Sequence, residues 1–558
     1  MKVLFVDLTK KKYYSEEVEV EQNGIIDLGL KLHFDQKTYQ LAAGNPKNLL
    51  IFGAGPFNFG GANRGVFVFR SPVHGGIHSS TLGDAGTFIK KTGFDALVFL
   101  GRSAQPCFLI IDEKEVVFRQ VPAAGNVFKL EKIIFNQLKS EGYNVASDFR
   151  IALAGSLAAK LPYGVIVFSK PNQSGRQISV AGRGGVGSVM IQSHNLSGFA
   201  FGGDCQLLSE KLPVSPRVAI EATEKYRQYG TKANFCNLKE NLPMFNWSTF
   251  SRSVNLRKRL HQDLIEDQFL LGLKTVSATC GESCLATCRK QECGRRLDYE
   301  PYESMGPLIG VFDRGLTRKL VMKADSLGLD IIYFGNILSA VLEAGAKGKL
   351  DLKKLFGVSY RSDFDFGKKN WKGSKQNYLV ADGLINDLIK NPKSLLLGRI
   401  SQVAKRLSIE EFAFYLSYQN GFDMVPNIYR SLGLYLPIAM PGKYFSDYQT
   451  KADTPVKYAK ICAQKGMDEY QLDNLGLCRF HRGWLVDVLK KQPGNPKQGL
   501  SKLIEYRRLA KADQVLWQSP RMIQTVKDLL AENKLQTSPK QYYNVWTKTY
   551  RKFFADFS

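Results

Sequence analysis

Short apolar runs separated by glycine-rich turns dominate the first part of the chain. Runs of four or five apolar or alternating residues occupy positions 3–6, 49–52, 66–69, 96–100, 108–111, 150–153 and 165–168. Runs of this length, bounded by Gly and Pro, are typical of β-strands. We therefore predict a β-rich domain over residues 1–205, whose first strand begins close to the N-terminus.

The pattern changes at about residue 213, where apolar residues begin to recur at helical spacing. Residues 214–229, 254–269, 316–327, 382–389 and 397–406 favour helix, and the chain from residue 499 is mostly helical and basic. Residues 351–376 are polar and lysine-rich, which is typical of a surface linker, and residues 421–445 are broken by Pro and Gly and predict a loop. Two mainly helical domains, 206–400 and 401–558, are expected after the β-rich one. The predicted fold class is α+β.

The composition is typical of a cytoplasmic globular protein. The chain has 558 residues, of which 44% are hydrophobic, enough for a large buried core. No window approaches the roughly 18 to 20 unbroken apolar residues of a membrane span, and the N-terminus has no signal-peptide layout. Nine cysteines, an odd number gathered mainly in one region, argue against a secreted disulfide framework. A reducing cytoplasm is therefore the expected location.

The net charge is strongly positive. There are 77 Lys and Arg against 51 Asp and Glu, a formal net charge of +26. Such a field attracts polyanions, acidic protein partners or phosphorylated small molecules. The basic residues are dispersed and no DNA- or RNA-binding motif is present, which argues against a nucleic-acid partner.

Glycine-dense turns lie between the predicted strands. Residues 53–56, 60–64 and 70–77 contain several glycines, and residues 181–190 read Ala-Gly-Arg-Gly-Gly-Val-Gly-Ser-Val-Met. Glycines allow the backbone to approach a ligand closely, and exposed backbone amides can hold phosphate. Arg64 and Arg183 are placed to add charge-assisted contacts. Tight hairpin turns are the alternative interpretation of each turn taken alone.

Cysteines are concentrated in one short stretch. Cys280, Cys284 and Cys288 have three residues between neighbours, Cys293 follows, and Cys478 is a distant fourth candidate. Three local thiolates and one remote thiolate are typical of a four-iron, four-sulfur cluster. Zinc is the second interpretation, and a set of buried structural thiols is the third.

A six-residue motif occurs twice. Asp325-Ser-Leu-Gly-Leu-Asp330 is echoed by Asp473-Asn-Leu-Gly-Leu-Cys478 about 150 residues later. We call these the first and second Asp-x-Leu-Gly-Leu boxes. Glycine ends or bends a helix, and a carboxylate at a helix end can accept paired N–H bonds from a heterocycle. Two copies indicate two similar heterocycles or one pseudo-symmetric ligand, although each copy alone is also an ordinary helix terminus.

In their order along the chain, these motifs resemble those of the tungsten-dependent aldehyde ferredoxin oxidoreductase family. The resemblance rests on residues 181–190, on Arg70-Ser-Pro with Gly75-Gly76 after it, on the cysteine stretch and on both boxes. Residues 29–33, 67–72 and 426–444 are most similar to the glyceraldehyde-3-phosphate branch of that family. The resemblance implies a β-rich N-terminal domain that cradles two pterins, covered by two mainly helical domains.

The resemblance also assigns site residues by position. It implies cluster ligands at Cys280, Cys284, Cys288 and Cys478, and an acid/base group at Glu303. The residues implied in cofactor binding are Arg64, Arg70, Thr81, Gly83, Arg183, Gly184, Asp325, Gly328, Leu329, Asp330, Asp473 and Leu477.

The activity implied by the resemblance is aldehyde oxidation, with glyceraldehyde 3-phosphate converted to 3-phosphoglycerate and electrons passed to ferredoxin. The implied cofactors are a tungsten or molybdenum bis-pterin, a [4Fe-4S] cluster and Mg²⁺. Arg430 and Lys443 are candidate anchors for the substrate phosphate. A monomer or homodimer without a membrane partner is expected. Two alternatives stay open: another aldehyde substrate, and a non-catalytic basic protein on the same fold that binds a redox partner or nucleic acid.

Three positions differ from the family pattern. Three residues separate Cys280 from Cys284 where the family usually has two, so Cys293 is an alternative to Cys280 as a ligand. Phe445 stands where other branches place a histidine, and Thr81 stands where an asparagine is common near magnesium. His481, just after Cys478, is a candidate for a hydrogen bond to the cluster, although a surface histidine or one already satisfied by other partners is the favoured interpretation.

Overall fold

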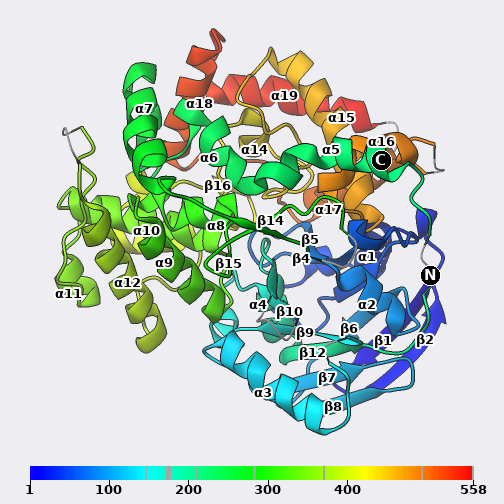
Figure 1. Cartoon of the computed structure of the whole chain (residues 1–558). Coiled ribbons are helices and arrows are strands. Elements are labelled where there is room, and N and C mark those ends of the chain that lie inside the picture. Colours follow the sequence, from blue (N-terminus) through cyan, green and yellow to red (C-terminus); the bar gives the residue numbers. More distant parts are fainter. Residues whose placement is uncertain are drawn as a thin grey trace.

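The computed structural model describes residues 1–145, 147–170, 177–207, 210–280, 284–367, 371–491 and 494–555. Two β-sheets occupy the N-terminal part of the chain, and helices cover them on one side and above in Figure 1. The helices of the middle segment, coloured green, lie beside the sheets, and those of the last segment, coloured orange to red, lie over them. The α+β prediction is confirmed.

The first sheet contains six strands in the order β2-β1-β6-β3-β4-β5. Only β1 and β6 pair in parallel, and the other neighbours pair antiparallel. Its strands are β1 (Lys2–Asp7), β2 (Lys12–Glu17), β3 (Leu50–Ala54), β4 (Arg64–Arg70), β5 (Ile77–Gly83) and β6 (Ala96–Leu100). Helices α1 (Ile25–Asp35) and α2 (Ala85–Lys91) connect them.

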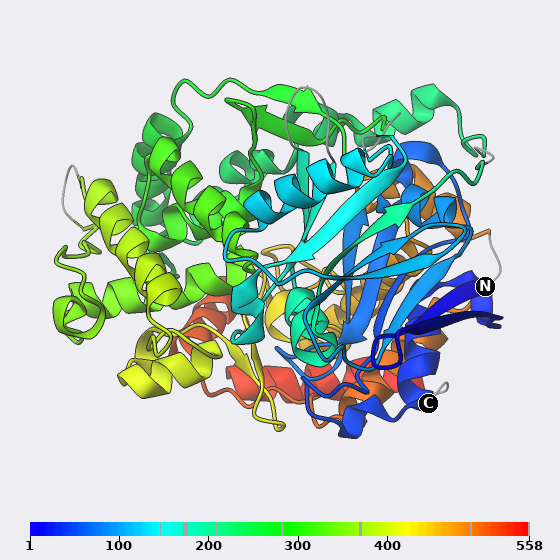
Figure 2. The same cartoon turned by 90° about the horizontal axis from the view of Figure 1, so that it is seen from below.

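The second sheet repeats this topology. Its order, β8-β7-β12-β9-β10-β11, has the same single parallel pair, here β7 with β12. Its strands are β7 (Cys107–Ile111), β8 (Val116–Gln120), β9 (Phe149–Ala154), β10 (Ile166–Lys170), β11 (Gln177–Ala181) and β12 (Leu196–Gly202). Helices α3 (Val127–Ser140) and α4 (Val186–His194) take the places of α1 and α2. The N-terminal domain is therefore built from two halves of one topology, and Figure 2 shows their strands side by side.

The two sheets enclose an aromatic core. Phe52 and Phe67 of the first sheet stack with ring centroids 4.0 Å apart, and Phe199 and Phe201 of the second sheet meet Phe52 edge-on. Every strand predicted from an apolar run is confirmed. Strands β2, β5, β8, β11 and β12 were missed, because they are polar, glycine-rich or join directly to a turn.

Helices dominate the chain after residue 213. They are α5 (Pro216–Tyr229), α6 (Asn234–Asn237), α7 (Val254–Leu260), α8 (Tyr299–Ser304), α9 (Arg314–Leu327), α10 (Ile331–Ala346), α11 (Leu352–Phe356), α12 (Ser374–Lys390), α13 (Ile400–Leu407), α14 (Leu432–Tyr435), α15 (Pro455–Asn474), α16 (Arg482–Leu489), α17 (Pro496–Leu509), α18 (Pro520–Glu532) and α19 (Pro539–Phe554). Short strands β13 (Val276–Ala278), β14 (Arg289–Glu292) and β15 (Arg295–Arg296) form a small sheet, and β16 (Leu416–Ser417) pairs with β17 (Asp423–Met424).

The helix predictions are confirmed with two refinements. The predicted helix at 254–269 is α7 continued by a π-helix, His261–Phe269. The predicted linker at 351–376 contains α11 and the start of α12, while its residues 368–370 lie outside the described part of the chain. The predicted loop at 421–445 holds only β17 and the short α14. No described helix is long and apolar enough to cross a lipid bilayer.

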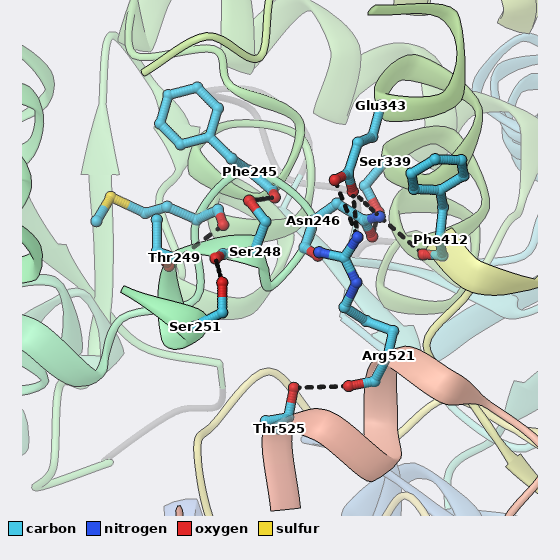
Figure 3. A network of polar contacts seen from close by, with 11 residues as sticks. Phe245, Asn246, Ser248, Thr249, Ser251, Ser339, Glu343, Phe412, Arg521 and Thr525 are labelled. Carbon is cyan, nitrogen blue, oxygen red and sulfur yellow. Dashed lines mark hydrogen bonds and ion pairs between the residues drawn. The ribbon is translucent and has the colours of Figure 1, made fainter. Parts of the chain in front are cut away.

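A buried polar network joins three helical segments far apart in the sequence (Figure 3). Arg521 of α18 donates to both carboxylate oxygens of Glu343 in α10, at 2.9 and 3.0 Å. Asn246 donates to Glu343 Oε2 at 2.6 Å and to the carbonyl oxygen of Phe412 at 2.7 Å, and it accepts from Ser339 Oγ at 2.8 Å. Each buried charge has a partner of opposite sign, as the low dielectric of an interior requires.

Candidate functional site

A cavity of about 400 Å³ lies where the sheets meet the helices. The edge strands of the two sheets, β5 and β11, lie next to each other here. Thr81 of β5 and Val180 of β11 line the cavity, and its wall also takes residues from α5, α8, α9, the β14–β15 hairpin and the segment 427–448. The site is therefore shared between the sheet domain and both helical segments.

The cavity wall is strongly cationic. Its basic residues are Arg64, Arg183, Lys225, Arg289, Arg295, Arg296, Lys443, Arg479 and Arg482, and its acidic residues are Asp298, Glu300, Asp325 and Asp330. Low-dielectric walls with an excess of one charge concentrate ligands of the opposite charge. The arrangement favours an anionic ligand.

The first box lies at the junction of α9 and α10. Helix α9 ends at Leu327, and Gly328 follows in the left-handed conformation, with φ of +69°. The carbonyl oxygen of Gly328 then accepts from the backbone N–H of Val165 at 2.9 Å, and the N–H of Asp330 donates to the carbonyl of Tyr163 at 2.9 Å. The box is thus joined by backbone hydrogen bonds to the loop that leads into β10.

The second box has the same backbone arrangement against the other sheet. Gly476 follows α15 with φ of +63°. Its carbonyl accepts from the N–H of Arg64 at 2.7 Å, and the N–H of Cys478 donates to the carbonyl of Ala62 at 2.7 Å. Leu477 forms an isolated bridge with Asn63, just as Leu329 does with Gly164 in the first box.

Close backbone packing supports both junctions. A Cβ on Gly155, after β9, would come 2.0 Å from the carbonyl oxygen of Leu327, and a Cβ on Gly55, after β3, would come 1.8 Å from that of Leu475. Only glycine allows such an approach. The repeated sequence motif is therefore a repeated structure, with each box bound to the equivalent loop of one half of the sheet domain.

Carboxylates of the first box face the cavity. Burial raises the pKa of Asp325 to about 7. Asp330 begins α10, accepts from the N–H of Tyr333 at 3.1 Å and lies 3.3 Å from Nη1 of Arg183. Burial raises its pKa as well, although Arg183 opposes the rise. Gly184, with φ of +75°, follows Arg183 in the turn between β11 and α4.

The carboxylate of the second box is held by a buried ion pair. Lys443 Nζ lies 2.6 Å from Asp473 Oδ2, and Ser79 Oγ donates to the same oxygen at 3.2 Å. Burial opposes ionisation of Asp473, but Lys443 and Arg479 outweigh it and hold its pKa below the ordinary value. Burial lowers the pKa of Lys443 to about 8. Lys443 lines the cavity, whereas Asp473 lies directly behind it.

Arg64 links the cavity to the cysteines. Its guanidinium lies in the wall, with Nη2 donating to Cys478 Sγ at 3.1 Å and Nη1 to Thr81 Oγ1 at 3.4 Å. Burial opposes the charge, but the nearby thiols of Cys478 and Cys280 outweigh it and raise the pKa of Arg64. A cation in this position favours thiolates.

The four predicted cluster ligands lie together. Cys280 and Cys284 form a side-chain hydrogen bond. This bond is the main reason that the pKa of the Cys284 thiol is raised, burial is the second, and the nearby Cys478 and Cys288 add to the rise. A Cβ on Gly83 would come 2.7 Å from Cys280 Sγ, so the first sheet closes over this thiol. Residues 281–283 of the predicted ligand loop lie outside the described part of the chain.

No three described His, Cys, Asp or Glu side chains are arranged as ligands of one metal ion. An iron–sulfur cluster binds one thiolate at each of four irons, so its ligands stand farther apart than those of a single ion. Cys293 is exposed at the turn of the β14–β15 hairpin. The thiols of Cys280, Cys284, Cys288 and Cys478 therefore lie together, whereas Cys293 lies on the exposed hairpin.

His481 is buried beside these thiols. Trp484 Nε1, which can only donate, donates to His481 Nδ1 at 3.1 Å. His481 therefore carries its proton on Nε2, which lies 3.6 Å from Cys284 Sγ. Burial lowers its pKa to about 4, so the ring is neutral and donates to sulfur.

Several predicted residues do not line the cavity wall, among them Arg70, Glu303 and Arg430. Arg70 is buried near Phe422, with its Nε and Nη1 unpaired among the described residues. Glu303 is fully buried, and neither of its oxygens has a partner in the described part of the chain. Burial raises its pKa well above the ordinary value. Arg430 does not line the cavity and instead forms an ion pair with Glu532, the last residue of α18.

Several wall residues were not predicted as site residues. Arg295 and Arg296 come from the β14–β15 hairpin, and Arg479 and Arg482 follow the second box directly. Glu300 lies one helical turn before Glu303. The signal for Arg479 and Arg482 was their position next to a motif, whereas no sequence pattern marks the hairpin.

The wall has the groups that two anionic heterocycles need. Phosphates require cationic donors, and the buried Nε atoms of Arg64 and Arg183 have no partner among the described residues. Ring N–H groups require carboxylates, and Asp325 faces the cavity. The residues therefore fit a pair of phosphorylated pterins.

Two family models match the chain. The N-terminal domain of aldehyde ferredoxin oxidoreductase matches residues 3–203, and domains 2 and 3 of aldehyde ferredoxin oxidoreductase match residues 212–370. Together they cover more than half of the chain, which belongs to the aldehyde ferredoxin oxidoreductase family.

Individual relatives have low sequence identity to this chain, but two of them align with most of its length. The chain is 29% identical to the glyceraldehyde-3-phosphate:ferredoxin oxidoreductase of Pyrococcus furiosus, over 88% of this chain and 87% of the relative. It is also 29% identical to an uncharacterised protein of Methanocaldococcus jannaschii, over 88% and 86%. A tungsten-containing aldehyde ferredoxin oxidoreductase of Pyrococcus furiosus is 26% identical over 62% of this chain and 58% of the relative.

One solved structure shares the fold along the whole chain. It is the active site complex BamBC of benzoyl coenzyme A reductase, with a TM-score of 0.65, 15% identity, and coverage of 100% of this chain and 98% of that one. At this identity the likeness establishes the fold and nothing finer.

Proposed function

We propose that this protein oxidises an aldehyde to a carboxylate at a bis-pterin tungsten centre in the described cavity, and passes the electrons through a [4Fe-4S] cluster to ferredoxin. One observation supports the proposal most strongly: the first box and the cationic residues line one cavity, and Arg64 in that wall donates to the Cys478 thiol of the second box. Molybdenum is the alternative metal.

In this proposal each of the two boxes binds one of the two pterins. Asp325, Gly328, Leu329 and Asp330 would hold one pterin, and Asp473 and Leu477 would hold the other, because the two boxes have the same backbone geometry. Arg64 and Arg183 would meet the phosphates, and Thr81 would lie near a magnesium ion between them.

Bound tungsten would supply a Lewis acid and a two-electron acceptor. The oxidation of an aldehyde by water yields a carboxylic acid, two protons and two electrons. Glu303 is the proposed acid/base group: it follows Tyr302, which lines the cavity, and it is a buried carboxyl with a raised pKa and no partner in the described part of the chain, an environment in which proton-transfer groups are often found. General base catalysis of this kind contributes about 10² to 10⁴ in rate.

The thiol site would carry electrons away from the cavity. Arg64 and His481 both donate to cysteine sulfur, and donors to sulfur raise the reduction potential of an iron–sulfur cluster. The net charge of +26 favours an acidic protein such as ferredoxin as electron acceptor.

The proposed substrate is glyceraldehyde 3-phosphate. The cationic wall suits a phosphorylated aldehyde, and the Pyrococcus furiosus relative named for this substrate aligns with most of the chain. Arg479 is the better phosphate anchor than Arg430, because it lines the cavity with Nη1 unpaired among the described residues.

The proposal is tested on protein purified without oxygen. We expect tungsten, iron and pterin in the protein, and reduction of ferredoxin that depends on glyceraldehyde 3-phosphate. Protein that contains iron but neither tungsten nor molybdenum would overturn the proposed reaction. Equal turnover of phosphorylated and unphosphorylated aldehydes would overturn the proposed substrate alone.

A further inference from the structure

Four polar side chains form a connected group on one side of the cavity. Glu300 of α8, Tyr429 and Tyr444 of the 427–448 segment, and Asn234 of α6 all line the wall. Tyr429 Oη donates to Glu300 Oε1 at 3.0 Å, and Tyr444 Oη donates to the same oxygen at 2.7 Å. Asn234 Nδ2 donates to Tyr429 Oη at 2.9 Å.

The hydrogen bonds of this group fix which atom remains for a ligand. Each tyrosine has one hydroxyl proton, and both protons are used on Glu300 Oε1. Burial and the Glu300 charge raise the pKa of both tyrosines well above the ordinary value, so they stay donors. Glu300 Oε2 has no hydrogen-bond partner in the described part of the chain and belongs to a side chain that faces the cavity.

Glu300 is also free of cationic partners among the described residues, although nine Arg and Lys share its wall. Arg479 stacks on the ring of Tyr444 at 4.7 Å from the centroid and pairs with Glu469 and Asp473 rather than with Glu300. The second carboxylate oxygen of Glu300 is therefore an acceptor that suits a hydroxyl donor rather than an anionic phosphate.

We propose that Glu300, positioned by Tyr429 and Tyr444, binds a hydroxyl group of the substrate and selects hydroxyaldehydes over aldehydes that lack the hydroxyl. This inference rests on the proposed function and adds a specificity determinant to it. Glu300 is the contact, and the two tyrosines and Asn234 hold it in position. Arg479, on the ring face of Tyr444, lines the same cavity with its Nη1 unpaired among the described residues, and is the proposed partner for an anionic group of the same ligand.

The test uses two substrates that differ by one hydroxyl: glyceraldehyde 3-phosphate and its 2-deoxy analogue, 3-oxopropyl phosphate. A hydrogen bond to a charged group makes the wild-type kcat/KM for the hydroxylated substrate about 10- to 150-fold higher. In Glu300→Met, which keeps the length of the side chain but cannot accept, the ratio falls to about 1. Tyr429→Phe and Tyr444→Phe give intermediate ratios. Tyr448→Phe is the matched control, because Tyr448 lines the same cavity but bonds Arg482, so its ratio stays at the wild-type value.

Equilibrium binding provides a readout independent of turnover. Calorimetry with 3-phosphoglycerate and its 2-deoxy analogue, on anaerobic holoenzyme, shows the same preference in wild type and its loss in Glu300→Met. Tungsten and iron contents of Glu300→Met equal to those of wild type exclude misfolding. If Glu300→Met loses metal, Glu300→Gln is the second variant, because its side-chain oxygen still accepts from both tyrosines. Equal wild-type rates and affinities for the two members of each pair overturn the inference and leave aldehyde oxidation intact. Failure to oxidise any aldehyde overturns the proposed function, while the calorimetric comparison still decides the hydroxyl site.

Discussion

Replacing Asp325 by Asn should stabilise the cofactor-free protein, and by an amount that grows with pH. Asp325 lies in the last turn of α9 and faces the cavity. Burial raises its pKa from 3.8 to about 7, so the folded protein holds this proton over a pH range where the unfolded chain has released it. Stability contributed by the protonated form is therefore complete below about pH 4 and is lost as pH rises to 7.

The size of the effect follows from the two pKa values. Each unit between them is worth about 1.4 kcal/mol, so the loss reaches at most about 4 kcal/mol above pH 7, and less where water in the cavity solvates the carboxylate. Asparagine cannot ionise and avoids the loss. The difference in unfolding free energy, variant minus wild type, should be near zero at pH 4 and should rise to its maximum by pH 8.

Urea unfolding of cofactor-free protein at pH 5, 6, 7 and 8 measures this difference from the shift in midpoint. Asp351→Asn is the matched control, because Asp351 is an exposed residue that caps α11 and asparagine caps a helix equally well. We expect the difference in unfolding free energy from wild type to stay constant with pH for Asp351→Asn and to rise with pH for Asp325→Asn. A difference that is flat or falls from pH 5 to 8 would refute the account of Asp325 as a buried, proton-retaining carboxyl. In loaded protein a ligand N–H bonded to the carboxylate lowers its pKa, so the rise should move to lower pH.

Three further predictions concern the thiols, the helical network and the boxes. Cys478→Ser should lose most of the bound iron and visible absorbance, whereas Cys293→Ser should keep both because Cys293 is exposed on a hairpin; iron analysis separates them, and equal losses would contradict the ligand assignment. Arg521→Met should lower the unfolding free energy by about 3 to 5 kcal/mol, because it leaves a buried carboxylate of α10 without its cation; a loss under about 1 kcal/mol in urea unfolding would count against that network. Gly476→Ala should prevent docking of the second box and reduce pterin content, since a Cβ would come 2.8 Å from a backbone nitrogen, whereas Gly357→Ala, with a similar φ of +68° but open space, should cost only about 1 kcal/mol and keep pterin.

The sequence was sufficient for the fold class and for the longer elements. Apolar runs at β-strand length and helical spacing locate most strands and helices, because each signal is local. The duplicated topology of the two sheets was not predicted. Its evidence is the order in which strands pair, and the pairing depends on contacts between positions far apart in the chain.

The same limit applies to the site. The boxes, Arg64 and Arg183 could be proposed because each belongs to a short motif. The group around Glu300 could not, since its carboxylate and the hydroxyl of Tyr444 come from segments 144 residues apart. Pairing of Arg430 with Glu532 likewise depends on α18, which no local pattern connects to residue 430.

The positions of the two boxes in the sequence bear on the order in which the parts of the site assemble. The first box emerges from the ribosome with the middle segment and can dock on the second sheet at once, whereas the second box follows about 150 residues later. Until the second box is made, the N–H of Arg64 and the carbonyl of Ala62 lack their backbone partners, and the Cys478 thiol is not yet beside the Arg64 guanidinium. The contact that joins the cavity wall to the thiols is therefore completed last, when the second box docks on the first sheet.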